Sequence, residues 1–242
     1  MADEITGILL RRYGDEILLG GIYGSTARGT DTEYSDLEML LVVEDGTRAR
    51  SVNFAFEVIP VEVNVKRFSE VERDIGDIEL DWPLKLGRLF NLKATCGDPT
   101  ILEKLREILN EIPSERFDEF IASETPLCYE GLGRLKSVEI RGNTHEAPLF
   151  VMEVLMEFML LTAIFNREFI NHDYLGGLHE SFEFERLPPD YRLIAERLMN
   201  LRELERGEAV SLADRFVRNF VEYTAQNGIK VKEHTPLEEV NF

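Results

Sequence analysis

The pattern of hydrophobic and polar positions divides the chain into a mixed first half and a helical second half. In the first half, segments with helical spacing alternate with short apolar runs that are typical of buried strands. The expected strands cover residues 17–23, 37–43 and 57–65. The expected helices cover residues 3–13, 68–80, 82–92 and 100–112. This alternation predicts a sheet flanked by helices.

The second half has helical spacing almost throughout. Pro113-Ser114 marks the boundary, because proline limits the helix before it and serine can cap the next one. Beyond it, we expect helices over residues 115–136, 146–166, 190–206 and 211–226, with a loop over 171–189. The prediction is therefore an α+β protein, with a mixed sheet flanked by helices over residues 1–112 and an all-helical up-and-down bundle over 113–242.

The charge of the chain excludes one broad class of partner. Its 27 Lys+Arg residues face 46 Asp+Glu residues, for a formal net charge of −19. Such a surface repels phosphate backbones, because affinity for nucleic acids rests largely on basic side chains that displace counterions. We expect no nucleic-acid partner, and a cationic small molecule suits the charge better.

Three features predict a cytoplasmic protein without a membrane partner. The most apolar segment, residues 147–165, carries Glu153 and Glu157 and therefore predicts a buried helix rather than a membrane span. The N-terminal sequence has neither a basic region nor a cleavage site of the kind that signal peptides carry. The two cysteines, Cys96 and Cys128, form no metal-type cluster, as expected in a reducing compartment.

A glycine-rich segment after the first expected strand is the first candidate site. Gly24 and Ser25 stand where a short helix could begin. Glycine lets the backbone approach a phosphate closely, and the free N–H groups of a helix start can hold its oxygens. Arg28 lies one turn further on and can add a fixed positive charge. The segment is a candidate phosphate-binding turn.

Carboxylates on two expected strands form the second candidate site. Asp36 and Glu38 are two residues apart, so both side chains project from one face of a strand. Glu62 lies between inward-facing valines on another strand and can add a third carboxylate. Carboxylates at this spacing hold divalent cations such as Mg²⁺, which bridge to substrate phosphates. Residue types alone leave open a second interpretation, in which these charges are only solvated.

The same residues resemble a known family. Gly24-Ser25 followed by Asp36-x-Glu38 is similar to the signature of polymerase-beta-type nucleotidyltransferases, and the chain resembles the kanamycin nucleotidyltransferase branch of that superfamily. The matching segments are GIYGSTARGTDTEYSDLEMLLV at 21–42, VEVN at 61–64, SEVERDIGDIELDWPLKLGRLF at 69–90 and GLGRLKSVEIRG at 131–142. The first segment matches the superfamily, and the last two indicate this branch.

The resemblance implies a role for each residue of the sheet half. Ser25 and Arg28, with Gly24 in the turn, would bind the nucleotide phosphates. The three carboxylates would bind two Mg²⁺ ions and act in catalysis, and they are Asp36, Glu38 and Glu62. The implied reaction transfers a nucleoside monophosphate, AMP when ATP is the donor, to a hydroxyl group and releases pyrophosphate.

The resemblance also implies roles in the helical half. Glu130 matches the family's general base, which takes the proton of the acceptor hydroxyl. Arg134 stands where the family has a lysine that contacts phosphate, so the charge is kept and its shape changes. Without the resemblance, this i,i+4 spacing is typical of a surface ion pair. The resemblance further implies a homodimer whose active site is shared between subunits.

Two departures from the family bear on the acceptor. Pro126 and Leu127 replace acidic residues that help hold a cationic antibiotic, and a further acidic position falls on Asn53 or Glu57. The expected acceptor is a small, aminoglycoside-like molecule. Two alternatives stay open: an adenylyltransferase that modifies proteins, as antitoxins of this fold do, and a nucleotide-binding module without catalysis.

Overall fold

The computed structural model describes residues 1–172, 174–200, 204–205 and 207–233. Its contacts divide the chain into two compact units. The first contains Met1–Ile78 and Leu84–Ile112, and the second contains Glu79–Pro83 and the chain from Pro113 onward. A mixed sheet with helices is thus followed by a helical region, which confirms the predicted fold class.

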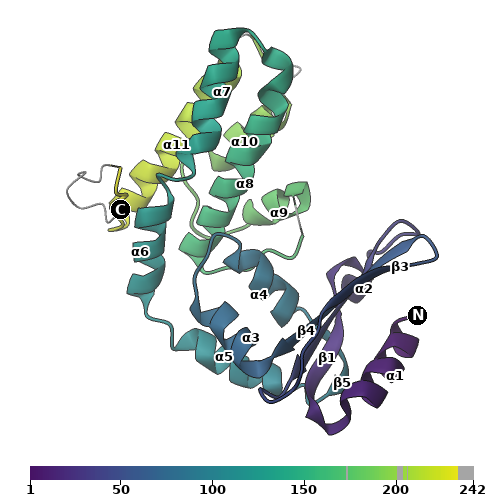
Figure 1. The fold of residues 1–242 in the computed structure, drawn as a ribbon. Helices are drawn as coiled ribbons and strands as arrows, with labels where there is room; N and C mark the ends of the chain where they lie inside the picture. Colours follow the sequence, from purple (N-terminus) through teal and green to yellow (C-terminus); the bar gives the residue numbers. More distant parts are fainter. Residues whose placement is uncertain (173, 201–203, 206, 234–242) are drawn as a thin grey trace, which may run out of the picture. The chain divides into compact units, whose positions relative to one another are not determined.

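The first unit is built on a five-stranded sheet in the order β3-β4-β2-β1-β5 (Figure 1). Its strands are β1 (Ile17–Tyr23), β2 (Leu37–Val43), β3 (Val52–Phe56), β4 (Ile59–Arg67) and β5 (Lys93–Gly97). Only β2 and β4 run parallel, and the other neighbours are antiparallel. Its helices are α1 (Ala2–Tyr13), α2 (Gly24–Arg28), α3 (Phe68–Gly76), α5 (Ile101–Asn110) and most of α4 (Trp82–Phe90), with the 3₁₀ turn Gly14–Glu16.

Alternation along β2 and β4 gives the sheet two different faces. One face is apolar and forms a core cluster with Leu9 and Tyr13 of α1. Its strand residues are Ile22, Leu37, Met39, Leu41, Val43, Val61, Val63 and Val65. Because strand side chains alternate, Glu38, Glu62 and Asn64 point from the other face. The apolar core therefore orients the polar residues of the candidate site.

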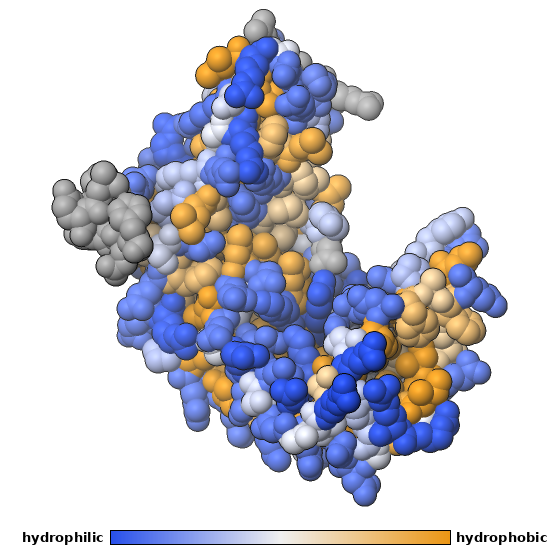
Figure 2. Space-filling view, viewed as in Figure 1, coloured by the Kyte–Doolittle hydropathy of each residue, from blue (hydrophilic) through white to orange (hydrophobic). Residues whose placement is uncertain are grey.

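Two strands were not expected from the sequence. β3 is an edge strand whose residues are all exposed, and Figure 2 shows hydrophobic surface over it, where Val52, Phe54 and Phe56 project. The strand predicted over 57–65 begins at Ile59, because Glu57 lies in the turn that joins β3 to β4. β5 is short and mostly exposed, so its side chains give no burial pattern to detect.

The second unit surrounds one long apolar helix, α8 (Ala147–Asn166). Phe158 packs edge-on against Phe216 and Phe220, with ring centroids 6.3 and 5.4 Å apart. The other helices are α6 (Ser114–Glu124), α7 (Tyr129–Arg141), α9 (Tyr174–Ser181), α10 (Tyr191–Met199) and α11 (Glu208–Gln226), with the 3₁₀ turn Thr144–Glu146. α8 has the length and hydropathy of a membrane span, but 61% of that stretch is buried.

Three predictions for the second half of the chain were wrong in detail. The helix expected over 115–136 is two helices, because the chain turns over residues 125–128 around Pro126, which has no N–H to continue the α-helical ladder. The loop expected over 171–189 contains the short helix α9. The helix expected over 190–206 ends at Met199, and residues 201–203 and 206 lie outside the described residues.

Trp82 belongs to the helical unit although it begins α4. Its side chain is fully buried, and its ring lies 5.3 Å from that of Phe117 and 5.9 Å from that of Phe169. The neighbouring Pro83 carbonyl accepts a hydrogen bond of 3.1 Å from the Ile170 N–H. The division between the two units therefore falls inside α4, after Pro83.

Candidate active site

A row of polar residues crosses four strands of the sheet. The strand registers pair Asn53 with Glu62, Glu62 with Glu38, and Glu38 with Tyr23. Register partners on neighbouring strands point from the same face, with Cβ atoms about 4.5–5.5 Å apart. The sheet thus brings the Glu38 and Glu62 carboxylates side by side, on the face opposite α1.

The turn after β1 brings its backbone against this row. β1 ends at Tyr23, and Gly24 begins α2 with a φ of 70°, in the left-handed region. A Cβ at Gly24 would overlap Oε2 of Glu38, so any other residue would displace the Glu38 carboxylate from this place. Ser25 and Arg28 are carried on the single turn of α2 that follows, and the Ser25 carbonyl accepts the Thr30 N–H at 3.0 Å.

Asn64, two residues after Glu62 on β4, orients the Glu62 carboxylate. Its side-chain amide donates a hydrogen bond of 2.9 Å to Oε1 of Glu62 and another of 3.0 Å to the Tyr23 hydroxyl. Burial raises the pKa of Tyr23 well above its usual range, and the charges of Glu62 and Glu38 raise it further. Tyr23 therefore stays protonated and keeps its hydroxyl hydrogen as a donor.

Asp36 stands apart from the paired glutamates. It is exposed and directly precedes β2. Across the part of the chain that the structure describes, no three His, Cys, Asp or Glu side chains are close enough together to hold a metal ion. The carboxylate oxygens of Glu38 and Glu62 are still the donors that Mg²⁺ prefers, and Oε2 of Glu38 lies directly against the Gly24 backbone. These residues fit a divalent cation in chemistry.

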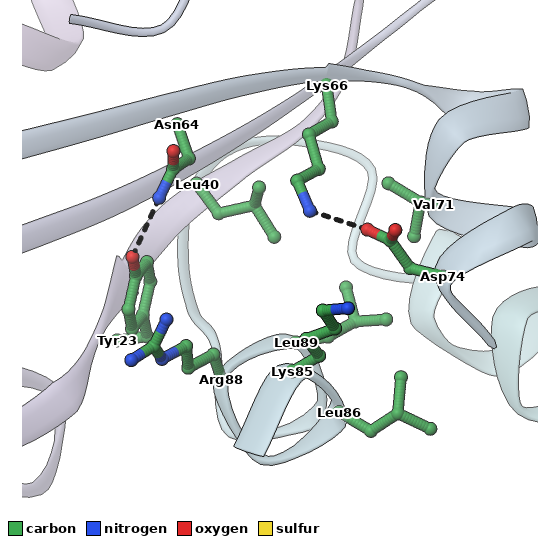
Figure 3. A pocket seen from close by; sticks show the side chains of 10 residues that line it. All are labelled: Tyr23, Leu40, Asn64, Lys66, Val71, Asp74, Lys85, Leu86, Arg88 and Leu89. Atoms are coloured by element: carbon green, nitrogen blue, oxygen red, sulfur yellow. Dashed lines mark hydrogen bonds and ion pairs between the residues drawn. The ribbon is translucent and has the colours of Figure 1, made fainter. Parts of the chain in front are cut away.

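A cavity of about 70 Å³ continues from this row along the same face (Figure 3). Tyr23 and Asn64 form one wall, and Arg88 of α4 lies beside the Tyr23 ring. Further along, the Lys66 ammonium pairs with the Asp74 carboxylate at 2.5 Å. The candidate site is thus bordered by basic side chains as well as carboxylates.

The helical unit holds a second charged group. The guanidinium of Arg134 binds the Glu130 carboxylate through Nη2 and the Glu153 carboxylate through Nη1, both at 2.6 Å. Glu130 is the most exposed of the three, with 67% of its side chain accessible, against 26% for Glu153. Glu130 and Arg134 therefore share one face of α7, as their spacing predicts, and α8 contributes a third member.

Glu157 lies one turn beyond Glu153 on α8. Its Oε2 is buried and has no hydrogen-bond partner among the described residues. Burial raises the pKa of Glu157 to about 7, and the charges of Glu153 and Glu130 add to the rise. Carboxylates from two helices thus gather beside Glu130.

The structure also shows where the residues that depart from the family pattern lie. Pro126 and Leu127 lie in the turn between α6 and α7, and Leu127 is 66% exposed. Asn53 lies directly opposite Glu62 in the register, whereas Glu57 lies in the turn before β4 with a φ of 55°. Asn53, not Glu57, therefore occupies the place beside the third carboxylate.

Asn64 and Glu153 belong to these two groups, although neither was predicted as a member. Asn64 follows Glu62 by two residues, so its place on the same strand face was a usable signal. Glu153 carried a different signal, as a charge inside an apolar helix. The contact of Glu153 with Arg134 depends on how α7 packs on α8, which the sequence does not encode locally.

Comparison with known proteins places the chain in a family. The profile described as "KNTase C-terminal domain" matches residues 99–230, which is more than half of the chain. The chain belongs to this family. The match covers α7 and α8, so both Glu130 and Arg134 lie within it.

Comparisons over the whole chain show that the similarity also includes the sheet unit. The chain is 25% identical over 237 residues to proteins named aminoglycoside nucleotidyltransferase (4') from Bacillus sp and from Staphylococcus aureus. Each alignment covers 97% of this chain and 93% of the relative. In fold, it is similar to a nucleotidyltransferase-like protein from Exiguobacterium sibiricum 255-15, with a TM-score of 0.51 and 14% identity over 94% of this chain and 76% of that one. The chain is a kanamycin nucleotidyltransferase-like protein.

Proposed function

We propose that the protein transfers a nucleoside monophosphate, AMP from ATP, to a hydroxyl group of a small acceptor. The acceptor oxygen attacks the α-phosphorus, a new O–P bond forms, and the bond to the β-phosphate oxygen breaks, so that pyrophosphate leaves. Residues 1–112 act as the nucleotidyltransferase domain and residues 113–242 as the helical domain. The observation that carries the proposal is the pairing of Glu38 with Glu62 beneath Gly24.

The sheet unit binds the nucleotide in this proposal. Ser25 and Arg28 hold phosphate oxygens at the turn that follows β1. Asp36, Glu38 and Glu62 bind divalent cations, with Mg²⁺ and two ions as the specific proposal. When bound, Mg²⁺ supplies charge that neutralises the phosphates and the leaving group. The positions of Glu38 and Glu62 on one face, fixed by Asn64 and Gly24, support this assignment.

The helical unit supplies the base. Glu130 takes the proton of the attacking hydroxyl, and Arg134 contacts phosphate. Family membership over residues 99–230 supports these roles, because α7 lies inside the matched segment. We propose a homodimer in which α7 of one subunit completes the carboxylate site of the other, as the family resemblance implies.

The acceptor is a small cationic molecule of the aminoglycoside kind. Pro126 and Leu127 bring no charge to the α6–α7 turn, but α8 adds Glu153 and Glu157 beside Glu130. The site next to the base thus keeps an acidic character through a different helix. The names of the two 25% identical relatives support the same acceptor class.

A cytoplasmic location completes the proposal. Cys96 and Cys128 are free thiols, which suits a reducing compartment.

The test is a transfer assay with Mg·ATP and a panel of aminoglycosides, kanamycin included. Formation of an acceptor heavier by one nucleoside monophosphate, with one pyrophosphate released per product, supports the proposal. The same assay with labelled ATP in a cell lysate separates the alternatives. Label in protein would indicate a protein-modifying enzyme, and binding of Mg·ATP without any pyrophosphate release would indicate a binding module.

A further inference from the structure

The contact between α7 and α8 gives Arg134 an unusual anchorage. Its Nη2 faces Glu130 on its own helix, and its Nη1 faces Glu153 on the neighbouring helix, both at 2.6 Å. An arginine bound by one exposed carboxylate can swing on its flexible stem. Carboxylates on both ends of the guanidinium fix its plane as well as its position.

The packing of the helices makes this reach possible. Gly131 is buried on α7, next to Glu130, where α8 passes closely. A Cβ at Gly131 would stand 3.1 Å from Cγ and 3.3 Å from Cδ of Glu153, and 3.3 Å from Val154. The missing side chain thus leaves the space that the Glu153 stem fills, and Glu153 reaches Arg134 from a half-buried position.

We propose that Glu153 is a positioning residue: it holds Arg134 from α8 and thereby orients the Glu130 carboxylate on α7. The inference rests on the proposed function, in which Glu130 is the base and Arg134 contacts phosphate. Without Glu153, the Arg134 side chain can adopt several rotamers, and the Glu130 carboxylate that it binds changes position with it. The ionisable side chains that act on this network electrostatically are Glu157 of α8, Glu124 of α6 and, through Glu157 and Glu124, Cys128.

The kinetic test replaces the Glu153 carboxylate with a side chain of similar length. Glu153→Met is expected to lower kcat for transfer to kanamycin by about tenfold, with KM for Mg·ATP changed less than about threefold, because misplaced groups slow the reaction more than they weaken binding. Glu153→Gln keeps an acceptor oxygen for Arg134, so its kcat is expected to stay within about threefold of the wild type, while the loss of its charge raises KM for kanamycin.

Two controls separate positioning from a general structural effect. In a Glu130→Gln background, Glu153→Met should change the remaining rate less than about twofold, since Glu153 acts through Glu130. Glu196→Met removes another glutamate–arginine ion pair, the one with Arg192 at 2.7 Å on α10, and should leave kcat unchanged. A wild-type kcat in Glu153→Met, or an equal loss in both backgrounds, would overturn the proposal.

An NMR measurement tests the anchorage without any turnover. In the wild type, the two carboxylates should slow rotation of the Arg134 guanidinium, so its Nη–H groups should give separate signals. In Glu153→Met, rotation should be faster and these signals should merge. Merged signals in the wild type would overturn the proposal whether or not the variant folds. If the wild type shows separate signals but no transfer to any acceptor, the proposed function fails while the anchorage stands.

Discussion

Gly24 and Glu38 share one small space at the end of β1: a single methyl group on the glycine would overlap Oε2 of the glutamate. This relationship ties the proposed phosphate-binding turn to the carboxylate row. It gives one glycine two separate requirements, a left-handed φ of 70° and the absence of a side chain.

Gly24→Ala should abolish most transfer activity while the protein stays folded. The added Cβ displaces Glu38, and a misplaced group at a reacting centre costs on the order of a hundredfold in rate. The matched control is Gly29→Ala, at the end of α2, where φ is 71° and no atom lies within 4 Å of a Cβ. It carries the backbone strain alone and should stay within a few-fold of the wild type. Equal losses in pyrophosphate release would attribute the effect to strain.

Asn64→Leu should weaken Mg²⁺ binding, because Glu62 loses the hydrogen bond that orients its carboxylate. The variant keeps the volume and loses the amide that donates to both Glu62 and Tyr23. Hydrogen bonds to charged groups contribute about 1.5–3 kcal/mol, so a rate loss of roughly tenfold or more is expected. The half-saturating Mg²⁺ concentration should rise in a pyrophosphate-release assay. Asn110→Leu, at an exposed position on α5, serves as the control, and an unchanged Mg²⁺ dependence in Asn64→Leu would contradict the positioning of Glu62.

Glu130→Gln should retain nucleotide binding and lose turnover. Removal of a general base typically lowers the rate by a factor of about 10²–10⁴, while the phosphate contacts stay in place. Calorimetry with a non-hydrolysable ATP analogue measures binding, and product formation measures turnover. Glu115→Gln, on the exposed first turn of α6, is the matched control. A Glu130→Gln enzyme with the wild-type rate would reject the base assignment.

Glu157 should make stability depend on pH in a defined window. Because burial raises its pKa from 4.5 to about 7, the folded state binds a proton that the unfolded state releases between these values. Stability therefore falls as the pH rises from about 4.5 to 7 and is flat for this group above that. Glu157→Gln should remove this slope and stabilise the protein at pH 8 by on the order of 2 kcal/mol, which is less than the full shift corresponds to because the side chain is only half-buried and solvent screens its charge.

Chemical denaturation at pH 5 and pH 8 measures the effect. Glu222→Gln, at an exposed position on α11, should leave the difference between the two pH values as it is in the wild type. A wild-type pH difference in Glu157→Gln would show that its burial does not determine the slope.

The sequence predicted the parts of the fold that bury a regular apolar face. β1 and β2 lie where their apolar runs indicated, and the chain enters α2 at Gly24 as expected. β3 and β5 were not predicted because their residues are largely exposed, so no alternation of buried and exposed positions indicates a strand. α9 escaped because two glycines interrupt its eight residues.

The candidate site divides in the same way. Glu38 and Glu62 could be expected as neighbours because Glu38 interrupts an apolar strand and Glu62 lies between alternating valines. Their direct pairing, and the place of Asn53 opposite Glu62, depend on strand register, which forms between distant segments. The Arg134–Glu153 contact likewise depends on helix packing.

The proposed nucleotidyl transfer is tested most directly by following labelled nucleotide from Mg·ATP to kanamycin with the wild type and with Asp36→Asn. We expect a labelled acceptor with the wild type and no detectable product with Asp36→Asn, although both proteins are folded. Near-normal labelling by Asp36→Asn would contradict the proposed metal-binding carboxylates, and no labelled acceptor with the wild type would contradict the proposed transfer to an aminoglycoside.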